Sequence, residues 1–151
     1  MTQTDQELDR IERSIDIEAS AEKVWSLLEQ PGWWINEHEI EPDTPRRDEG
    51  DGVTVLVHEK WGEFRIVTVE SDPPRYLRYR WIEPDRDGAG TDVEFWVEDR
   101  PGGGVSLRVV ESGLTTLGKT HDELVKHHDG NSEGWELELA AAARYVTRSS
   151  A

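Results

Sequence analysis

Several large aromatic side chains lie on the apolar faces of predicted strands and helices. They are the first candidates for a ligand-binding site. The sequence holds seven Trp against two Phe and one Met. Aromatic walls with a few polar groups are typical of small-molecule pockets, yet aromatic residues also dominate ordinary cores. Core packing therefore stays open as the alternative for each candidate. The candidate pocket residues are Trp33, Trp34, Leu77, Tyr79, Trp81, Phe95 and Trp135.

Two charged residues, Arg13 and Glu111, share the apolar side of their predicted strands. A charge directed inward is costly unless it is paired. Either side chain could be a polar anchor in a cavity, Arg13 for a ligand acid or Glu111 as a general base. An ion pair at the cavity rim is the alternative.

The sequence gives little support for a metal site, a reactive thiol or a phosphate-binding loop. The chain has no Cys, which excludes disulfides, thiolate nucleophiles and Cys-based metal sites. The five His lack the His-Glu-x-x-His spacing, so we expect no metal site and no cofactor. The glycines at 102–104 precede neither a helix nor a Lys-Ser/Thr pair, and they predict a turn.

The elements that must position these residues begin with a strand. Apolar residues alternate with polar ones over residues 11–17, which indicates a half-buried strand. Ser20 stands at the expected N-cap of a short helix. Pro31-Gly32 ends that helix, and residues 33–35 are expected to begin a second. Residues 41–52, rich in Pro, Asp, Arg and Gly, are typical of a loop.

The rest of the chain predicts a set of strands followed by a helix. Alternation between residues 53 and 111 predicts about five antiparallel strands with one charged, solvated face. That outer face is expected to carry Arg78, Arg80, Glu94, Glu98 and Arg108. Residues 113–131 are expected to be a polar loop with a short helical piece, and residues 132–146 a helix. Strands gathered together with helices on one face indicate an α+β fold.

The charge of the chain disfavours two classes of binding partner. The formal net charge of −16 argues against nucleic-acid binding and against docking on an anionic membrane. The first residues lack the pattern of a signal peptide, and no apolar run approaches about 18 residues, so we expect no membrane insertion. The expectation is a cytoplasmic protein.

Four stretches, in this order, resemble the helix-grip superfamily of START-like domains (SRPBCC). Within it, the chain is most similar to the family named after the activator of heat-shock-protein-90 ATPase. The stretches are Ile17–Trp25, Asp72–Leu77 followed by Trp81, Val110–Leu114, and Gly134-Trp135 followed by Leu139. Together they indicate one domain over residues 10–147, with a disordered tail at 1–9 and another tail at 148–151.

The resemblance implies a curved antiparallel sheet wrapped around a long C-terminal helix, with two short helices after the first strand. It implies a cavity between the sheet and that helix. The first and last strands then pair antiparallel, which would bring Arg13 and Glu111 near each other. Domains of this kind bind or process hydrophobic small molecules such as lipids, sterols and polyketides, and some act as protein partners.

We therefore expect binding of a hydrophobic small molecule in the cavity, with no catalytic motif in the sequence. One alternative is an interaction module or homodimer resembling a co-chaperone, with Trp96 as the exposed contact. For Trp96 itself, the competing interpretation is a ring lying flat over the stem of Arg80 or Arg108. The other alternative function is a polyketide cyclase-type enzyme that uses Glu111 as acid–base.

Overall fold

The computed structural model describes residues 4–82 and 90–148, and these form one seven-stranded sheet with four helical segments. The strands are β1 (Arg10–Ile17), β2 (Arg46–Gly50), β3 (Val53–His58), β4 (Gly62–Asp72), β5 (Tyr76–Ile82), β6 (Gly90–Asp99) and β7 (Val105–Ser112). The helices are α1 (Asp5–Leu8), α2 (Ala21–Leu28), the 3₁₀ turn η1 (Leu114–Leu117) and α3 (His121–Arg148).

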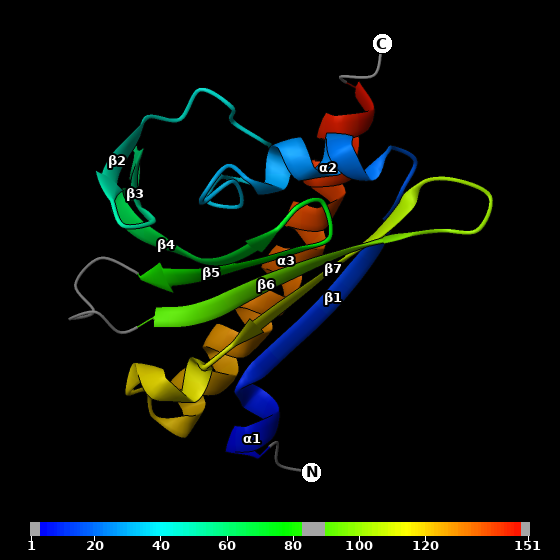
Figure 1. Cartoon of the computed structure of the whole chain (residues 1–151). Coiled ribbons are helices and arrows are strands. Elements are labelled where there is room, and N and C mark those ends of the chain that lie inside the picture. The colour runs from blue at the N-terminus through cyan, green and yellow to red at the C-terminus, as the bar shows by residue number, and fades with distance from the viewer. Residues whose placement is uncertain (1–3, 83–89, 149–151) are drawn as a thin grey trace.

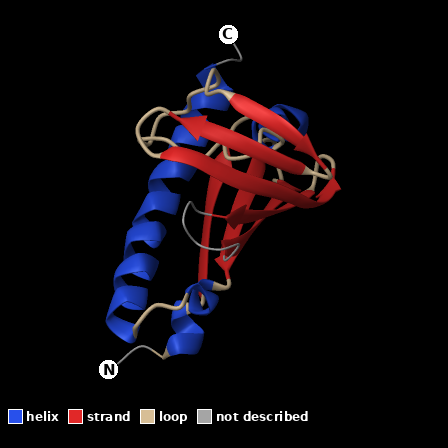
Figure 2. Ribbon diagram, turned by 90° about the vertical axis from the view of Figure 1, so that its left-hand side faces the viewer, coloured by secondary structure: helices blue, strands red, loops and turns tan. Residues whose placement is uncertain are grey.

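The sheet is antiparallel throughout, in the order β1-β7-β6-β5-β4-β3-β2. It curves around one side of α3 (Figure 1), and the curvature is clearest from the side (Figure 2). The first and last strands pair as expected. The α+β helix-grip fold is thereby confirmed.

Period-two alternation explains which strand faces are buried. Phe95 of β6 and Leu107 of β7 are fully buried, while their polar neighbours lie on the other face. On that outer face Arg78 and Arg80 bond Asp92 at 2.8 and 3.4 Å. The outer face is therefore charged and solvent-facing, as predicted.

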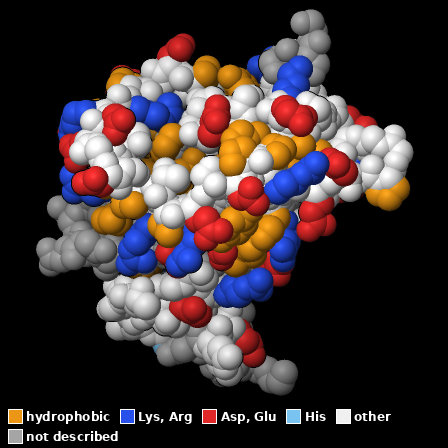
Figure 3. Space-filling view, in the orientation of Figure 1, with side chains coloured by type: hydrophobic (Ala, Val, Ile, Leu, Met, Phe, Trp, Pro, Cys, Tyr) orange, Lys and Arg blue, Asp and Glu red, His pale blue; other side chains and the backbone are white. Residues whose placement is uncertain are grey.

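Trp96 shares this outer face and is partly covered by a cation. The Arg108 guanidinium lies 4.2 Å from the centre of the Trp96 ring, and Arg108 also bonds Glu12 at 2.9 Å. The interpretation of Trp96 as a ring against an Arg stem is confirmed. Figure 3 shows this side of the molecule, with acidic and basic side chains interspersed among hydrophobic ones.

Helix α3 starts earlier than the sequence pattern suggested. It begins at His121 rather than near Ser132. Thr120 and Glu123 form a reciprocal cap: the Glu123 amide donates to Thr120 Oγ1, and the Thr120 amide donates to Glu123 Oε1. Burial of Leu124 then anchors the first turn. The short helical piece expected within residues 113–131 is confirmed by this cap, but it continues unbroken into the helix predicted from residue 132 instead of lying in a loop.

The segment after α2 differs from the expected second short helix. Ser20 does cap α2, accepting from the Lys23 amide at 3.2 Å. Beyond α2 the chain forms turns, in which the Trp33 amide donates to Gln30 and the Ile35 amide to Gly32. Gly32 has φ +80°, and a Cβ there would lie 2.8 Å from Leu56. The left-handed Gly32 confirms the predicted end of the first helix, but the residues after it form a turn and not a second helix.

Two further segments are more ordered than expected. Asp5–Leu8, predicted as part of a tail, form one helical turn, and Leu8 is completely buried. Arg46–Gly50, predicted as loop, pair with β3 as an edge strand. The outermost residues of both predicted tails, 1–3 and 149–151, lie outside the described residues. Within residues 4–82 and 90–148, no helix has the length and apolarity needed to cross a membrane.

Candidate ligand-binding site

A pocket of about 330 Å³ lies between α3, the turn after α2 and the strands β4 and β5. Its volume is at the lower end of the range for small-molecule sites, which is about 300–1,000 Å³. The pocket is lined by Trp34, Ile35, Asn36, His38, Trp61, Phe64, Trp81, Gly130, Asn131, Gly134, Trp135 and Glu138.

Tryptophan rings form most of the apolar wall. The Trp34 ring centre is 5.7 Å from those of Trp81 and Trp135. The planes of Trp34 and Trp81 meet at 75°, an edge-to-face arrangement that aromatic pairs favour. Trp61 stands at the β3–β4 turn and is 43% exposed. Three of the predicted pocket residues, Trp34, Trp81 and Trp135, therefore come together here.

The other predicted aromatic positions form a packed layer behind this wall. Trp33 and Tyr79 are buried, and the Trp33 ring centre is 5.5 Å from that of Phe95. The Tyr79 hydroxyl donates to the carbonyl oxygen of Leu28 at 2.6 Å, which ties β5 to α2. Leu77 is also buried in the core. None of these four belongs to the pocket lining, so for them the packing interpretation describes the geometry.

Two glycines of α3 leave room for the pocket. Gly130 and Gly134 are one helical turn apart, and both line the cavity. A Cβ built on either would meet no atom within 4 Å. Glycine inside a helix costs about 1 kcal/mol relative to alanine, and here no close backbone contact requires it.

Glu138 supplies a buried carboxyl at one end of the pocket. The residue is 5% exposed, and its Oε2 lies 3.0 Å from Nδ1 of His38. Its Oε1 has no hydrogen-bond partner among the described residues. Burial raises the pKa of Glu138 to about 8, although Asn36 and the His38 backbone oppose the shift. The carboxyl therefore keeps its proton near neutral pH.

The segment that carries His38 is held in an unusual conformation. His38 has φ +69°, a left-handed conformation that is uncommon outside glycine. Asn36 stabilises it, because its Oδ1 accepts from the His38 amide at 2.9 Å while its Nδ2 donates to the Trp33 carbonyl. Arg144 of α3 donates to the His38 carbonyl at 3.2 Å. These contacts position the imidazole beside Glu138.

Glu111 lies behind the pocket wall rather than in it. Its Oε1 accepts from the Trp135 indole at 2.9 Å and from Asn131 at 3.0 Å, and its Oε2 accepts from Thr91 at 2.7 Å. Glu111 is 1% exposed and does not line the cavity. This geometry anchors α3 to β7 and does not favour proton transfer to a ligand.

Arg13 has a different neighbourhood from Glu111. In the β1–β7 register Arg13 faces Val109, and Glu111 faces Ile11. The Arg13 Nε donates to Glu136 of α3 at 3.0 Å. The register makes Arg13 and Glu111 diagonal neighbours on the same face of the β1–β7 pair, but Arg13 bonds Glu136 and does not line the pocket among the described residues.

Sequence reasoning missed the polar end of the pocket and its glycines. The spacing of Gly130, Gly134 and Glu138, each four residues apart, would have placed them on one helix face. That signal was hidden because residues 113–131 were assigned to a loop. Nothing in the local sequence around Asn36 and His38 indicated a site.

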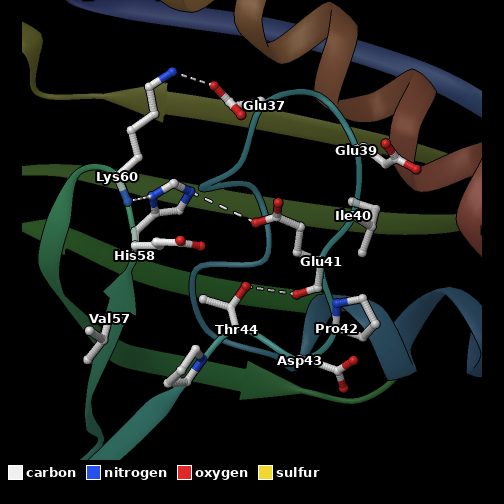
Figure 4. A pocket seen from close by; sticks show the side chains of 12 residues that line it. Glu37, Glu39, Ile40, Glu41, Pro42, Asp43, Thr44, Val57, His58 and Lys60 are labelled. Carbon is white, nitrogen blue, oxygen red and sulfur yellow. Dashed lines mark hydrogen bonds and ion pairs between the residues drawn. The ribbon is translucent and has the colours of Figure 1, made fainter.

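A larger hollow of about 1,040 Å³ lies beside the segment 37–45 (Figure 4). Lys60 there bonds Glu37 at 2.6 Å, and the His58 Nε2 is 3.9 Å from Glu41. Its lining carries five acidic side chains and no tryptophan among the described residues, unlike the first pocket. Across the described residues, no group of three His, Cys, Asp or Glu could hold a metal ion. This hollow is the weaker candidate site.

Comparisons with known proteins agree with the fold. Residues 18–146 match the family described as Activator of Hsp90 ATPase homolog 1-like protein. A crystal structure of a Mesorhizobium loti protein is similar, with TM-score 0.67 and 19% identity over 92% of this chain and 97% of that one. No match was found among curated protein sequences.

Two other similar structures have more descriptive names. The Aha1 dimer from Colwellia psychrerythraea has TM-score 0.64 and 16% identity over 91% of this chain and 95% of that one. DynU16, a putative protein in the dynemicin biosynthetic locus, has TM-score 0.55 and 19% identity over 92% of this chain and 47% of that one. At such identities the likeness concerns the fold alone. The family match, which spans most of the sequence, shows that this chain belongs to the Activator of Hsp90 ATPase homolog 1-like family.

Proposed function

We propose that this protein binds a hydrophobic small molecule in the pocket between α3 and the sheet. The observation that carries the proposal is the pair Gly130 and Gly134, which keeps one helix face bare over a tryptophan-lined cavity. Alanine at either position would strengthen the helix. The absence of side chains at these two positions therefore favours a pocket that serves to hold a ligand.

The physical gain from binding is the burial of apolar surface. Each square ångström of apolar area removed from water contributes about 25 cal/mol before the costs of association are subtracted. Trp34, Trp81 and Trp135 provide that surface in a preformed arrangement. The half-exposed Trp61 and His38 stand at the mouth, where a ligand would pass.

The alternative functions draw less support. An interaction module is suggested by the likeness to the Aha1 dimer, but the expected contact, Trp96, already stacks against Arg108. A cyclase-type enzyme is suggested by the likeness to a protein in a biosynthetic locus, but the oxygens of Glu111 are taken up by Thr91, Asn131 and Trp135.

Ligand titration followed by tryptophan fluorescence tests the proposal. A panel of fatty acids, sterols and flat aromatic compounds should include at least one that changes the emission saturably, because indoles line the pocket. Trp81→Ala should weaken this binding at least about fivefold by removing part of the wall. Trp96→Ala is the matched control, because it removes a tryptophan from the outer face, and it should leave the affinity unchanged.

Two results would count against the proposal. One is a panel in which no compound binds saturably. The other is an affinity that Trp81→Ala and Trp96→Ala change equally, since binding would then not take place in this pocket.

A further inference from the structure

We propose that the ligand of this pocket is an organic cation, an ammonium group carried on an apolar body, held by the tryptophan rings and the Glu138 carboxylate. The inference rests on the proposed function, because it names the class of ligand for the same pocket. Quaternary ammonium groups and protonated amines both belong to this class.

The wall of the pocket suits a cation. Four of its lining residues are tryptophans: Trp34, Trp61, Trp81 and Trp135. Tryptophan has the strongest cation–π attraction among the aromatic side chains. The Trp34 plane is inclined by 75° to Trp81 and by 43° to Trp135, so the rings of the wall are not parallel to one another. Such an aromatic cage can surround an ammonium group without hydrogen bonds.

Glu138 adds the negative charge that a cation needs. Among the described residues it is the one carboxyl group in the lining, it is almost fully buried, and its Oε1 lacks a hydrogen-bond partner there. A buried carboxylate is costly unless it is paired, and the empty protein meets this cost by keeping the group protonated. A bound cation would supply the missing partner and release the proton.

Among the described lining residues, the positive charge that could compete with a ligand for Glu138 is a protonated His38, whose Nδ1 lies 3.0 Å from Glu138 Oε2. The described residues that line it include neither Lys nor Arg. The charged and titratable groups that act on Glu138 are His38 and Glu41 from the segment after α2, and Arg144 from α3 itself. Arg144 is exposed and donates to the His38 carbonyl.

The electrostatic potential of the molecule also favours a cationic ligand. The formal net charge is −16, and the segment beside the pocket carries Glu37, Glu39 and Glu41. A negative potential attracts cations and repels anionic ligands. Arg13, the residue expected to hold a ligand acid, lies outside the pocket and bonds Glu136.

A matched pair of probes separates charge from shape. Benzyltrimethylammonium and neopentylbenzene have nearly the same form, and only the first is charged. Titrations of the wild-type protein at pH 8, followed by tryptophan fluorescence, should show the cation binding at least about tenfold more tightly. Equal or tighter binding of neopentylbenzene would overturn the ammonium preference and leave hydrophobic binding standing. Saturable binding of neither probe would overturn the preference together with the proposed function.

The variant Glu138→Gln tests whether the preference for the cationic probe arises in the pocket. The amide keeps the shape of the side chain and removes its charge, so the preference for the cation should fall to about threefold or less. Glu133→Gln removes the same charge from an exposed position of α3 and should keep the full preference. If both variants behave alike, the cation binds through general electrostatic attraction, and the proposal is wrong. Circular dichroism of each variant confirms that it is folded.

The pH dependence gives an independent readout. Because the cation favours the ionised carboxyl, its affinity should rise as pH increases toward the pKa of Glu138 near 8, by at most about tenfold per pH unit. Glu138→Gln should abolish this rise, whereas His38→Gln should retain it. A wild-type affinity that does not change between pH 6 and 9, or a rise that survives in Glu138→Gln, would contradict the assignment.

Discussion

Two buried glutamates lie close to Trp135, Glu111 through a hydrogen bond and Glu138 through the next turn of α3, and their surroundings give them different roles. Glu111 receives hydrogen bonds from Thr91, Asn131 and Trp135, so its burial is compensated and it joins β7 to α3. Glu138 shares one hydrogen bond with His38 and has a free oxygen within the described part of the chain. Incomplete compensation is typical of positions where a ligand completes the set of partners.

The stability of the protein should carry a signature of Glu138. The carboxyl has a pKa of about 8 when folded, raised by burial, against an ordinary value of 4.5. Between these two values the unfolded chain ionises while the folded protein stays neutral. The stabilisation is therefore complete below pH 4.5, falls as pH rises, and is lost above about pH 8.

Chemical denaturation of wild type and Glu138→Gln at pH 5 and pH 9 measures this effect. The free energy of unfolding of wild type, relative to Glu138→Gln, should decrease over this interval by on the order of 3 kcal/mol. Glu133→Gln serves as the control for general charge effects, because that side chain is exposed. A difference between wild type and Glu138→Gln that does not depend on pH would show that Glu138 titrates normally.

At the scale of elements, α3 has two roles: part of it packs against the core, and two of its glycines border the pocket. Its contacts run along β1, beside which it lies. Leu139 and Val146 are buried in the core, whereas Gly130 and Gly134 face the cavity. One helix thus holds the sheet and also leaves the space beside Trp81.

Gly134→Ala should stabilise the protein. A Cβ at this position meets no atom within 4 Å, and the backbone is already helical, so only the helix propensity changes. The free energy of unfolding should increase by about 0.5–1 kcal/mol, measured by denaturant titration. A loss of stability would mean that the space beside Gly134 is occupied in the folded protein.

The strands were predictable from the sequence because their signal is local. Alternation along residues such as Val93, Phe95 and Val97 specifies a buried face without knowledge of the partner strand. The sequence pattern predicted a short helical piece before residue 132, but not that it is continuous with α3, because the residues between are mostly polar. The helix stop at Gly32 was predicted correctly, but the second short helix after it was wrong, because the residues that follow form a turn.

The site was only partly predictable, for a physical reason. A tryptophan in the core and one in a pocket wall have the same sequence signal, so Trp33 and Trp34 could not be told apart. The environment of Glu138 depends on His38, which lies 100 residues away in the chain. Only the fold brings these two side chains within hydrogen-bond distance.

At the scale of the whole molecule, the sheet packs closely against α3 on the β1 side and leaves space on the side of β4 and β5. The helix packs along β1, while the rings of Trp34 and Trp81 fill part of the space beside β4 and β5. The remaining volume is the pocket.

The central claim, that this pocket holds a small molecule, is tested most directly by filling it. Gly134→Leu adds a side chain to the bare face of α3, and Glu133→Leu adds the same side chain to an exposed position next to it. Native mass spectrometry with the tightest ligand of the fluorescence panel should show one molecule bound per chain of wild type and Glu133→Leu, and none on Gly134→Leu. Equal ligand occupancy of Gly134→Leu and wild type would contradict the claim.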